Sequence, residues 1–173
     1  MTFARGFPPV HREDARLLIL GSMPSRESLA RQRYYAHPRN AFWPIVTDLL
    51  DIPSEDYEER CEGLRQRRLA LWDVLQACFR SGSLDSAIDE GSIVTNDFAG
   101  FLDGHRDVQR VYFNGAKAES MYRRHVLPTL QGRAANLPLR RLPSTSPAHA
   151  GMSLQQKREA WRVIVEEGLA GLE

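Results

Sequence analysis

Residues 16–25 read Arg-Leu-Leu-Ile-Leu-Gly-Ser-Met-Pro-Ser, and this stretch decides the fold. The compact apolar run that ends at Gly21 is typical of a strand buried on both faces, as strands are in parallel sheets. A glycine at the end of a strand lets backbone amides approach a ligand closely, and Pro24 stiffens the turn that follows. Turns of this kind are common, so the stretch alone indicates a strand and suggests a site.

Short apolar runs alternate with helical patterns along the rest of the chain. Further strands are predicted at residues 69–75, 92–95, 109–113 and 137–142. Helices are predicted at residues 42–50, 54–68, 96–103, 116–127 and 154–169, with Ser54 and Asn96 as N-caps. This alternation implies a parallel sheet with helices on both faces. Since the sequence has no repeat and no Pro/Gly/Ser-rich linker, we expect a single domain over residues 1–173.

The composition is that of an ordinary globular protein, with 42% hydrophobic and 26% charged residues. No run of about 18 apolar residues exists, and residues 1–10 lack the apolar core of a signal peptide, so we expect no membrane span and a cytoplasmic location. Cys61 and Cys78 have no Cys or His neighbours at metal-ligand spacing. We therefore expect buried or merely tolerated thiols, with neither a structural zinc nor a disulfide framework.

The net charge of +1 hides an uneven distribution. Residues 1–43 hold seven Arg against three acidic residues, and residues 105–141 hold eight Lys or Arg against two. Residues 48–103 hold thirteen acidic residues against five basic ones. If folding joins the two basic blocks, they form a face that attracts phosphates. The Arg-rich composition, 21 Arg to 2 Lys, is equally compatible with a solvated surface.

Polar or turn-forming clusters follow three of the predicted strands, at residues 21–25, 114–115 and 143–147. Ligands of open α/β sheets bind beyond the carboxyl ends of the strands. We therefore expect these clusters to converge on one crevice.

Residues 34–43, Tyr-Tyr-Ala-His-Pro-Arg-Asn-Ala-Phe-Trp, hold four aromatics, a His, an Arg and an Asn. Aromatic faces stack on nucleobases, and an Asn side chain can hydrogen-bond a base edge or hold a water molecule. The alternative for Phe42 and Trp43 is core packing that anchors the following helix.

Residues 142–149, Leu-Pro-Ser-Thr-Ser-Pro-Ala-His, place three hydroxyl residues between two prolines. A rigid loop of small residues can hold a phosphate through its hydroxyls and amides. The alternative is a tight surface turn.

Taken together, the segments Gly-Ser-Met-Pro-Ser-x-x-Ser-Leu (21–29), Tyr-Tyr-Ala-His-Pro-Arg-Asn-x-Phe-Trp (34–43) and Leu-Pro-Ser-Thr-Ser-Pro-Ala (142–148) resemble the uracil-DNA glycosylase superfamily. The hypoxanthine-DNA (deoxyinosine) glycosylase family is the most similar branch. Shorter stretches at residues 71–75, 82–86, 96–98 and 113–115 agree with it, so the resemblance covers roughly residues 15–165.

The resemblance implies a three-layer α/β/α sandwich with a central, mainly parallel four-stranded sheet and a pocket for a base flipped out of DNA. Ser22 and Met23 stand where the superfamily usually carries the Asp or Asn that orients the attacking water. In the hypoxanthine family this duty falls to the Asn of the His-Pro-Arg-Asn stretch, here Asn40. An amide orients water without deprotonating it, which suffices for an oxocarbenium-like transition state.

The resemblance also assigns the surrounding residues. The base pocket is predicted from Gly21, Ser22, Met23, Tyr35, Phe42, Asp73 and Asn114. Tyr35 and Phe42 are candidates to stack on the base, Asp73 to accept a ring N–H, and Asn114 to read an exocyclic oxygen. Contacts to the DNA backbone are predicted from Ser25, Ser144, Thr145, Ser146 and His149, the last standing where the family commonly has Asn.

The expected activity is hydrolysis of the N-glycosidic bond of hypoxanthine in double-stranded DNA by a monomer that needs neither cofactor nor metal. Uracil is the alternative substrate, because both deaminated bases present a carbonyl beside a ring N–H. A non-catalytic DNA-binding module of the same fold is a further alternative. A serine hydrolase built on Ser22 is disfavoured, because the Gly-x-Ser-x-Gly elbow is absent.

Overall fold

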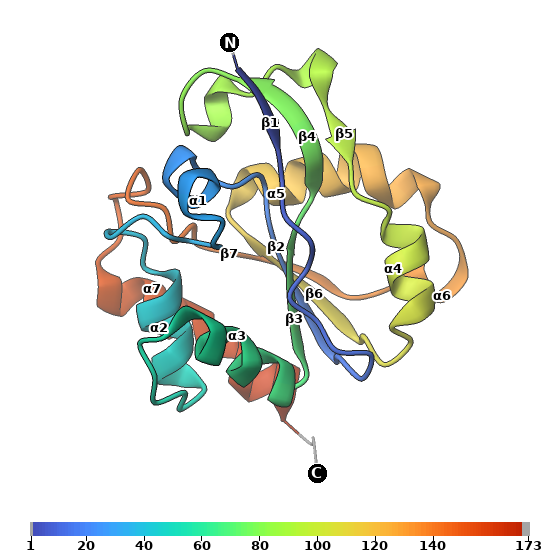
Figure 1. The fold of residues 1–173 in the computed structure, drawn as a ribbon. Coiled ribbons are helices and arrows are strands. Elements are labelled where there is room, and N and C mark those ends of the chain that lie inside the picture. Colours follow the sequence, from blue (N-terminus) through green and yellow to red (C-terminus); the bar gives the residue numbers. More distant parts are fainter. Residues whose placement is uncertain (1, 171–173) are drawn as a thin grey trace.

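The computed structural model describes residues 2–170, in which a four-stranded parallel sheet forms the centre of the molecule (Figure 1). Its strand order is β3-β2-β6-β7, and every neighbouring pair runs parallel. The strands are β2 (Leu17–Gly21), β3 (Leu69–Asp73), β6 (Arg110–Asn114) and β7 (Leu139–Leu142). The predicted fold class, with its four-stranded sheet, is confirmed.

Strand β2 lies between two hydrophobic cores because its side chains alternate between the faces of the sheet. Leu18 and Leu20 pack into the core on one face, while Leu17 and Ile19 pack into the core on the other. All four are fully buried, which explains why the run shows no polar alternation.

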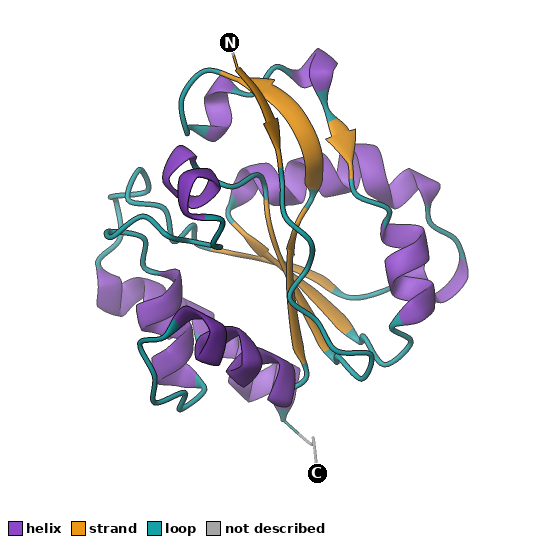
Figure 2. Cartoon of the chain, in the orientation of Figure 1, coloured by secondary structure: helices purple, strands orange, loops and turns teal. Residues whose placement is uncertain are grey.

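Helices cover both faces of this sheet, as the purple helices on either side of the orange strands show (Figure 2). One layer holds α2 (Phe42–Leu49), α3 (Tyr57–Gln66) and α7 (Leu154–Trp161). The other holds α4 (Phe98–Gly104), α5 (Ala116–Met121) and α6 (Gly132–Ala135). The remaining helix, α1 (Arg26–Arg31), follows β2 beyond its carboxyl end and was not predicted.

A second, antiparallel sheet was not predicted, although the predicted strand at residues 92–95 contains one of its strands. Its strands are β1 (Thr2–Arg5), β4 (Leu75–Arg80) and β5 (Val94–Thr95), with β4 in the middle. The predicted strand at 69–75 ends at Asp73, and the chain then enters β4. Because β1 and β4 are far apart in sequence, their pairing leaves no local pattern to recognise.

Both predicted N-caps are wrong by one or two residues. Helix α3 is capped by Asp56, whose carboxylate accepts a hydrogen bond from Glu59 N at 3.0 Å. Helix α4 is capped by Asp97 in place of Asn96. The Asn96 side chain instead donates to the Asp73 carbonyl at 2.8 Å, and so fixes the end of β3.

Two predicted helices change their winding before they end. After α5 the chain forms a π-helical segment, Tyr122–Val126, and a 3₁₀ turn, Leu127–Thr129, that contains Pro128. After α7 it forms a π-helical segment at Ile164–Leu169. Two short 3₁₀ turns, Asp85–Ala87 and Glu90–Ser92, connect β4 to β5.

Strand β2 lies between β3 and β6, so the chain adds β3 on one side of β2 and then β6 and β7 on the other. Such a switch point leaves a crevice beyond the carboxyl ends of the strands. No helix among residues 2–170 is long and apolar enough to cross a membrane. Cys61 and Cys78 are both buried and unbridged.

Candidate active site

A cavity of about 360 Å³ opens beyond the carboxyl ends of the parallel strands. The three polar clusters predicted to converge there do so. Of the thirteen residues predicted for the site, twelve line this cavity, namely Gly21, Ser22, Met23, Ser25, Tyr35, Asn40, Asp73, Asn114, Ser144, Thr145, Ser146 and His149. Phe42 is the exception.

Gly21 at the end of β2 forms part of the cavity floor. A Cβ atom at this position would lie 2.5 Å from Asp73 Oδ1 and 2.8 Å from the Tyr35 hydroxyl oxygen. Neither group could make room easily, because both belong to buried parts of the site. A side chain at this position would therefore displace one or both of these groups.

Tyr35 presents the aromatic surface of the cavity, and Phe42 lies behind it. Their rings are stacked with centroids 4.2 Å apart. Phe42 is fully buried and also packs edge-on against Trp43 and Trp161. In this geometry Phe42 contacts the core and supports Tyr35. Phe42 and Trp43 therefore pack in the core, as the alternative interpretation predicted.

The backbone at Tyr35 adopts a left-handed conformation, with φ of 55°. This is an uncommon conformation for an aromatic residue, and such residues gather at functional sites. The Tyr35 hydroxyl is buried close to the Asn114 side chain, yet it makes no hydrogen bond with it or with another described residue. Burial raises the pKa of Tyr35 above its ordinary value, so the hydroxyl stays neutral.

Asn40 occupies the turn that leads into α2. Its Oδ1 accepts a hydrogen bond from Phe42 N at 2.9 Å, and its backbone N–H donates to the His37 carbonyl at 2.9 Å. The side chain is thus held in an Asx turn, while its Nδ2 group makes no hydrogen bond with the described residues. This leaves a fixed amide donor, and one lone pair of Oδ1, at the cavity wall.

Asn114 joins β6 to the loop after β7. Its Nδ2 donates to Thr145 Oγ1, and its Oδ1 accepts from Thr145 N, both at 2.9 Å. The Thr145 carbonyl accepts a further hydrogen bond from Ala41 N at 3.0 Å. Thr145 is 1% exposed and ties the Asn40 turn to the sheet. The Asn114 side chain also lies close to the Tyr35 hydroxyl.

Two hydroxyls of the loop after β7 form hydrogen bonds with backbone N–H groups of the same loop. Ser144 Oγ accepts from Ser146 N, and Ser146 Oγ accepts from Ala148 N, both at 3.2 Å. Gly115, with φ of 96°, lets Ser144 approach, since a Cβ there would lie 3.2 Å from Ser144 Cβ. His149 is exposed at the cavity mouth.

Ser25 caps α1, where its hydroxyl accepts from Ser28 N at 3.1 Å. The buried Ser28 hydroxyl in turn accepts from Ala36 N at 3.1 Å. The two serines therefore connect the loop after β2 to the Tyr35 segment.

Three charged residues in or near the cavity, Asp85, Arg80 and Lys117, were not assigned a role from the sequence. Asp85 lines the cavity and accepts a short hydrogen bond from the Ser22 hydroxyl. Arg80 is 2% exposed and donates to the Pro24 carbonyl at 2.6 Å. Asp85 lies within the stretch 82–86, which is part of the family resemblance. This resemblance could have identified Asp85 as a site residue. Nothing in the local sequence indicated that Arg80 would be buried.

Burial raises the pKa of Asp73 to about 7, with a further increase from the charge of Asp85 and a decrease from Arg80. Burial also raises the pKa of Asp85, against the effects of the Ser22 hydrogen bond and of Arg80. Asp73 and Asp85 therefore form a carboxyl pair in which ionisation of both groups at neutral pH is unfavourable.

The predicted basic blocks are partly neutralised in the fold. Arg123 pairs with Glu119, Arg140 with Glu167, and Lys117, which lines the cavity, with Glu90. Within residues 2–170, no group of three or more His, Cys, Asp or Glu side chains is arranged to hold a metal ion.

Comparisons with known proteins agree on one family. The family described as the uracil DNA glycosylase superfamily matches residues 8–169. A "Hypoxanthine DNA glycosylase" of Methanosarcina acetivorans is 37% identical over 162 residues, which cover 92% of this chain and 96% of the relative. A protein of the same name from Methanosarcina barkeri is 38% identical over 116 residues, covering 66% of this chain and 72% of the relative.

Among solved structures, the solution NMR structure of a candidate uracil DNA glycosylase from Methanosarcina acetivorans superposes with a TM-score of 0.77. The two sequences are 36% identical, and the match covers 94% of this chain and 96% of the other.

Proposed function

The chain belongs to the uracil DNA glycosylase superfamily, and from that premise we propose that it is a monofunctional DNA glycosylase that removes hypoxanthine from DNA. The observation that carries the proposal is the single cavity in which Gly21, Asn40, Asp73 and Asn114 meet. At about 360 Å³ this cavity falls in the range of small-ligand pockets, roughly 300–1,000 Å³.

In the proposed reaction, cleavage of the bond between C1′ and the base leads, and water adds to the resulting cationic sugar. Asn40 orients that water through its amide, which the Asx turn holds in one position. Because the electrophile is already cationic, the water does not need a strong base. The reaction consumes one water molecule and requires no cofactor or metal ion.

The flipped base lies against Tyr35 in the proposed complex, with Phe42 supporting the ring from behind. Backbone amides of residues 21–23 lie near the departing base, where its negative charge develops. Asp73 reads the base edge, and an N–H of Asn114 donates to an exocyclic oxygen.

The DNA backbone is held by the loop after β7 and by the loop after β2. Ser144, Ser146 and His149 stand at the mouth of the cavity and supply contacts to phosphate. Thr145 and Ser25 hold these loops in shape through the hydrogen bonds described above. Double-stranded DNA as the substrate form, a monomeric state, a single domain over residues 1–173 and a cytoplasmic location stay predictions.

Uracil is the second candidate substrate. It is favoured by the similarity to the candidate uracil DNA glycosylase of known structure. Uracil and hypoxanthine share a carbonyl beside a ring N–H, so both fit the same polar groups, and the size of the closed pocket separates them.

A glycosylase assay on duplexes with a single deoxyinosine, a single deoxyuridine or no lesion tests the proposal. Alkali cleaves the abasic product, so strand breaks report base release. We expect cleavage of the deoxyinosine duplex only, or of that duplex in large excess over the deoxyuridine one. If both lesion duplexes stay intact, the protein is the non-catalytic DNA-binding module.

Variants of Asn40 separate its proposed catalytic role from its role in the turn. Asn40→Ala is expected to lose about 10²–10³-fold in rate. Asn40→Ser keeps an acceptor for Phe42 N, so its thermal stability should match that of the wild type, while its activity falls as in Asn40→Ala. Full activity of Asn40→Ala would remove the amide from the mechanism.

A further inference from the structure

Building on the proposed function, we infer that Asp73 reads the base as a neutral carboxylic acid. In this form it donates one hydrogen bond to the ring carbonyl and accepts another from the adjacent ring N–H. Asp85 acts as a positioning residue that keeps the proton on Asp73. The inference names the chemical feature that is recognised, which is the lactam edge of a deaminated base.

The surroundings of Asp73 disfavour a carboxylate. The residue is 4% exposed at the end of β3, and its Oδ2 atom is buried without a hydrogen-bond partner among the described residues. Its Oδ1 lies against the backbone of Gly21 at the cavity floor. A buried carboxylate normally accepts several hydrogen bonds, and an unpartnered one is costly.

Asp85 has the partners that Asp73 lacks. The Ser22 hydroxyl donates to Asp85 Oδ1, and the positive charges of Arg80 and Lys117 also favour the ionised form of Asp85. When two nearby carboxyls share limited stabilisation, the proton goes to the one without donors. The contacts therefore place the negative charge on Asp85 and the proton on Asp73.

Charged and titratable groups face Asp73 from several elements. The Arg80 side chain on β4 opposes the effect of Asp85, but its Nη2 donates to the Pro24 carbonyl. Arg80 Nε and Nη1 make no hydrogen bond with the described residues. The groups that face Asp73 or the rest of the cavity are Tyr34, Tyr35, Arg80, Asp85, Lys117 and His149.

A neutral acid matches the lactam edge in a way that a carboxylate does not. Its carbonyl oxygen accepts the ring N–H while its O–H donates to the ring carbonyl, which gives two parallel hydrogen bonds. A carboxylate accepts the N–H equally well but repels the carbonyl oxygen. Hypoxanthine and uracil both present this edge.

The same hydrogen bond assists bond cleavage. As the bond between C1′ and the base nitrogen breaks, its electron pair moves into the base and the ring carbonyl becomes more negative. The O–H donor then binds more strongly than in the ground state, which lowers the barrier. Asp73 keeps its proton. The attacking water supplies the hydroxyl on C1′ and, through solvent, the proton that ends on the base nitrogen.

The test is the pH profile of single-turnover hypoxanthine release from a deoxyinosine duplex. In the wild type the rate should fall as the pH rises through about 7, by about tenfold per pH unit, because the donor is lost when Asp73 ionises. Asp73→Asn carries a permanent N–H donor beside a carbonyl, so its rate should exceed that of Asp73→Ala and should not show this alkaline decline. Asp73→Ala should lose about 100-fold or more at every pH.

Asp85→Asn removes the neighbouring negative charge, so the alkaline decline should move to lower pH. Asp51→Asn is the matched control, because Asp51 is an exposed carboxylate after α2 whose left-handed backbone suits Asn. Its profile should follow the wild type. The inference is overturned if Asp73→Asn is as inactive as Asp73→Ala, or if its alkaline decline persists.

An independent measurement follows the ¹³C resonances of the Asp side-chain carboxyl groups during a pH titration of the free protein. The resonance that is missing in Asp73→Asn should titrate near pH 7. Titration at an ordinary carboxyl pKa would overturn the inference even if the enzyme is active. A wild type that releases no base refutes the proposed function, whereas this titration still tests the protonation of Asp73.

Discussion

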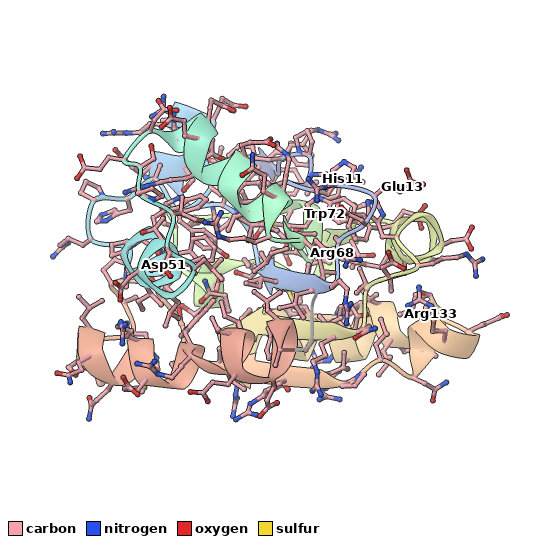
Figure 3. All side chains as sticks on the ribbon, turned by 90° about the horizontal axis from the view of Figure 1, so that it is seen from below. His11, Glu13, Asp51, Arg68, Trp72 and Arg133 are labelled. Atoms are coloured by element: carbon pink, nitrogen blue, oxygen red, sulfur yellow. The ribbon has the colours of Figure 1, made fainter. Side chains whose placement is uncertain are left out.

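Two sets of polar side chains, one at each end of the parallel sheet, differ in their hydrogen bonding. Near the amino ends of β2 and β6, His11 Nδ1 and His105 Nε2 lie 2.8 Å apart, and His105 Nδ1 lies 2.7 Å from the Phe101 carbonyl. His11 and Arg68 lie at this end (Figure 3). At the carboxyl ends, Asp73 Oδ2 and the Tyr35 hydroxyl are buried without hydrogen bonds to the described residues.

This contrast distinguishes polar groups that stabilise the fold from polar groups that can bind a ligand. A buried polar atom without a partner costs about 1–3 kcal/mol, so a fold tolerates such atoms together only where something else is gained. At the amino end the imidazole pair is satisfied by the protein itself. At the carboxyl end a bound base would supply the missing partners.

Gly21→Ala is the change with the largest expected effect. The added Cβ would displace the Asp73 carboxyl and the Tyr35 hydroxyl, which lie 2.5 and 2.8 Å from its position. Since a displacement of about 1 Å at a reacting centre can cost roughly 100-fold, we expect at least that loss in single-turnover rate. Gly104→Ala, at a position where the new methyl group would meet no neighbour within 4 Å, is the control and should keep its activity.

His105→Ala should show the reverse pattern. It removes a ring stacked on Phe101 at 3.9 Å together with the hydrogen bonds of that ring, so stability should fall by about 2–4 kcal/mol in urea denaturation. The rate per folded molecule should stay within about twofold of the wild type, given the distance from the cavity. A large loss of activity in the folded variant would contradict the division between the two ends.

Thr145→Val tests a residue that is structural although it lies in the site. The substitution nearly conserves shape but removes the hydroxyl that accepts from Asn114 Nδ2 at 2.9 Å. We expect a loss of about 1–3 kcal/mol in stability. The rate should fall by about tenfold, because Asn114 and the Asn40 turn lose a common anchor. Thr129→Val, whose hydroxyl donates to Val126 O away from the cavity, is the control for activity.

The pH dependence of stability should have opposite signs at the two ends. The raised pKa of Asp73 means that its contribution is fully present below the ordinary carboxyl pKa of 3.8 and is lost as the pH rises towards about 7. Asp73→Asn should therefore raise the melting temperature by a few degrees at pH 8, and less at pH 4.

The smallest effect is expected at His11. Burial lowers the pKa of His11, with further decreases from His105 and Arg65. Its contribution is therefore present above the ordinary His pKa of 6.5 and is lost as the pH falls through the lowered value. His11→Gln should flatten the decline of the melting temperature below pH 6, and an unchanged slope would contradict this assignment.

Local chemistry was enough to predict the central sheet and the approximate place of the site. The uninterrupted run from Leu17 to Leu20 required a strand between two cores, and the clusters after three strands required one crevice. The helix ends were harder. Asp97 and Asn96 are both good N-caps, and only the contact of Asn96 with the end of β3 decides between them.

Residues 34–43 illustrate what the sequence leaves open. The stretch indicates an aromatic surface beside an amide, but Tyr35 and Phe42 are equally good candidates to contact a base. The left-handed backbone at Tyr35 and the packing of Phe42 against Trp161 place one ring at the cavity and the other in the core. Such a choice depends on contacts more than a hundred residues apart.

By itself, then, the sequence determined the strands of the parallel sheet, the edge at which the polar loops gather and the family. The strands and the edge follow from residue type and short-range periodicity, which are local properties, whereas the family follows from the resemblance of the three long motifs. Only the tertiary structure decided that the charges of Asp85 and Arg80 act on Asp73 and that β1 joins β4 in a second sheet. The reason is physical: burial and charge proximity arise from long-range packing, and they set the protonation of a carboxyl group that no local pattern distinguishes from a surface aspartate.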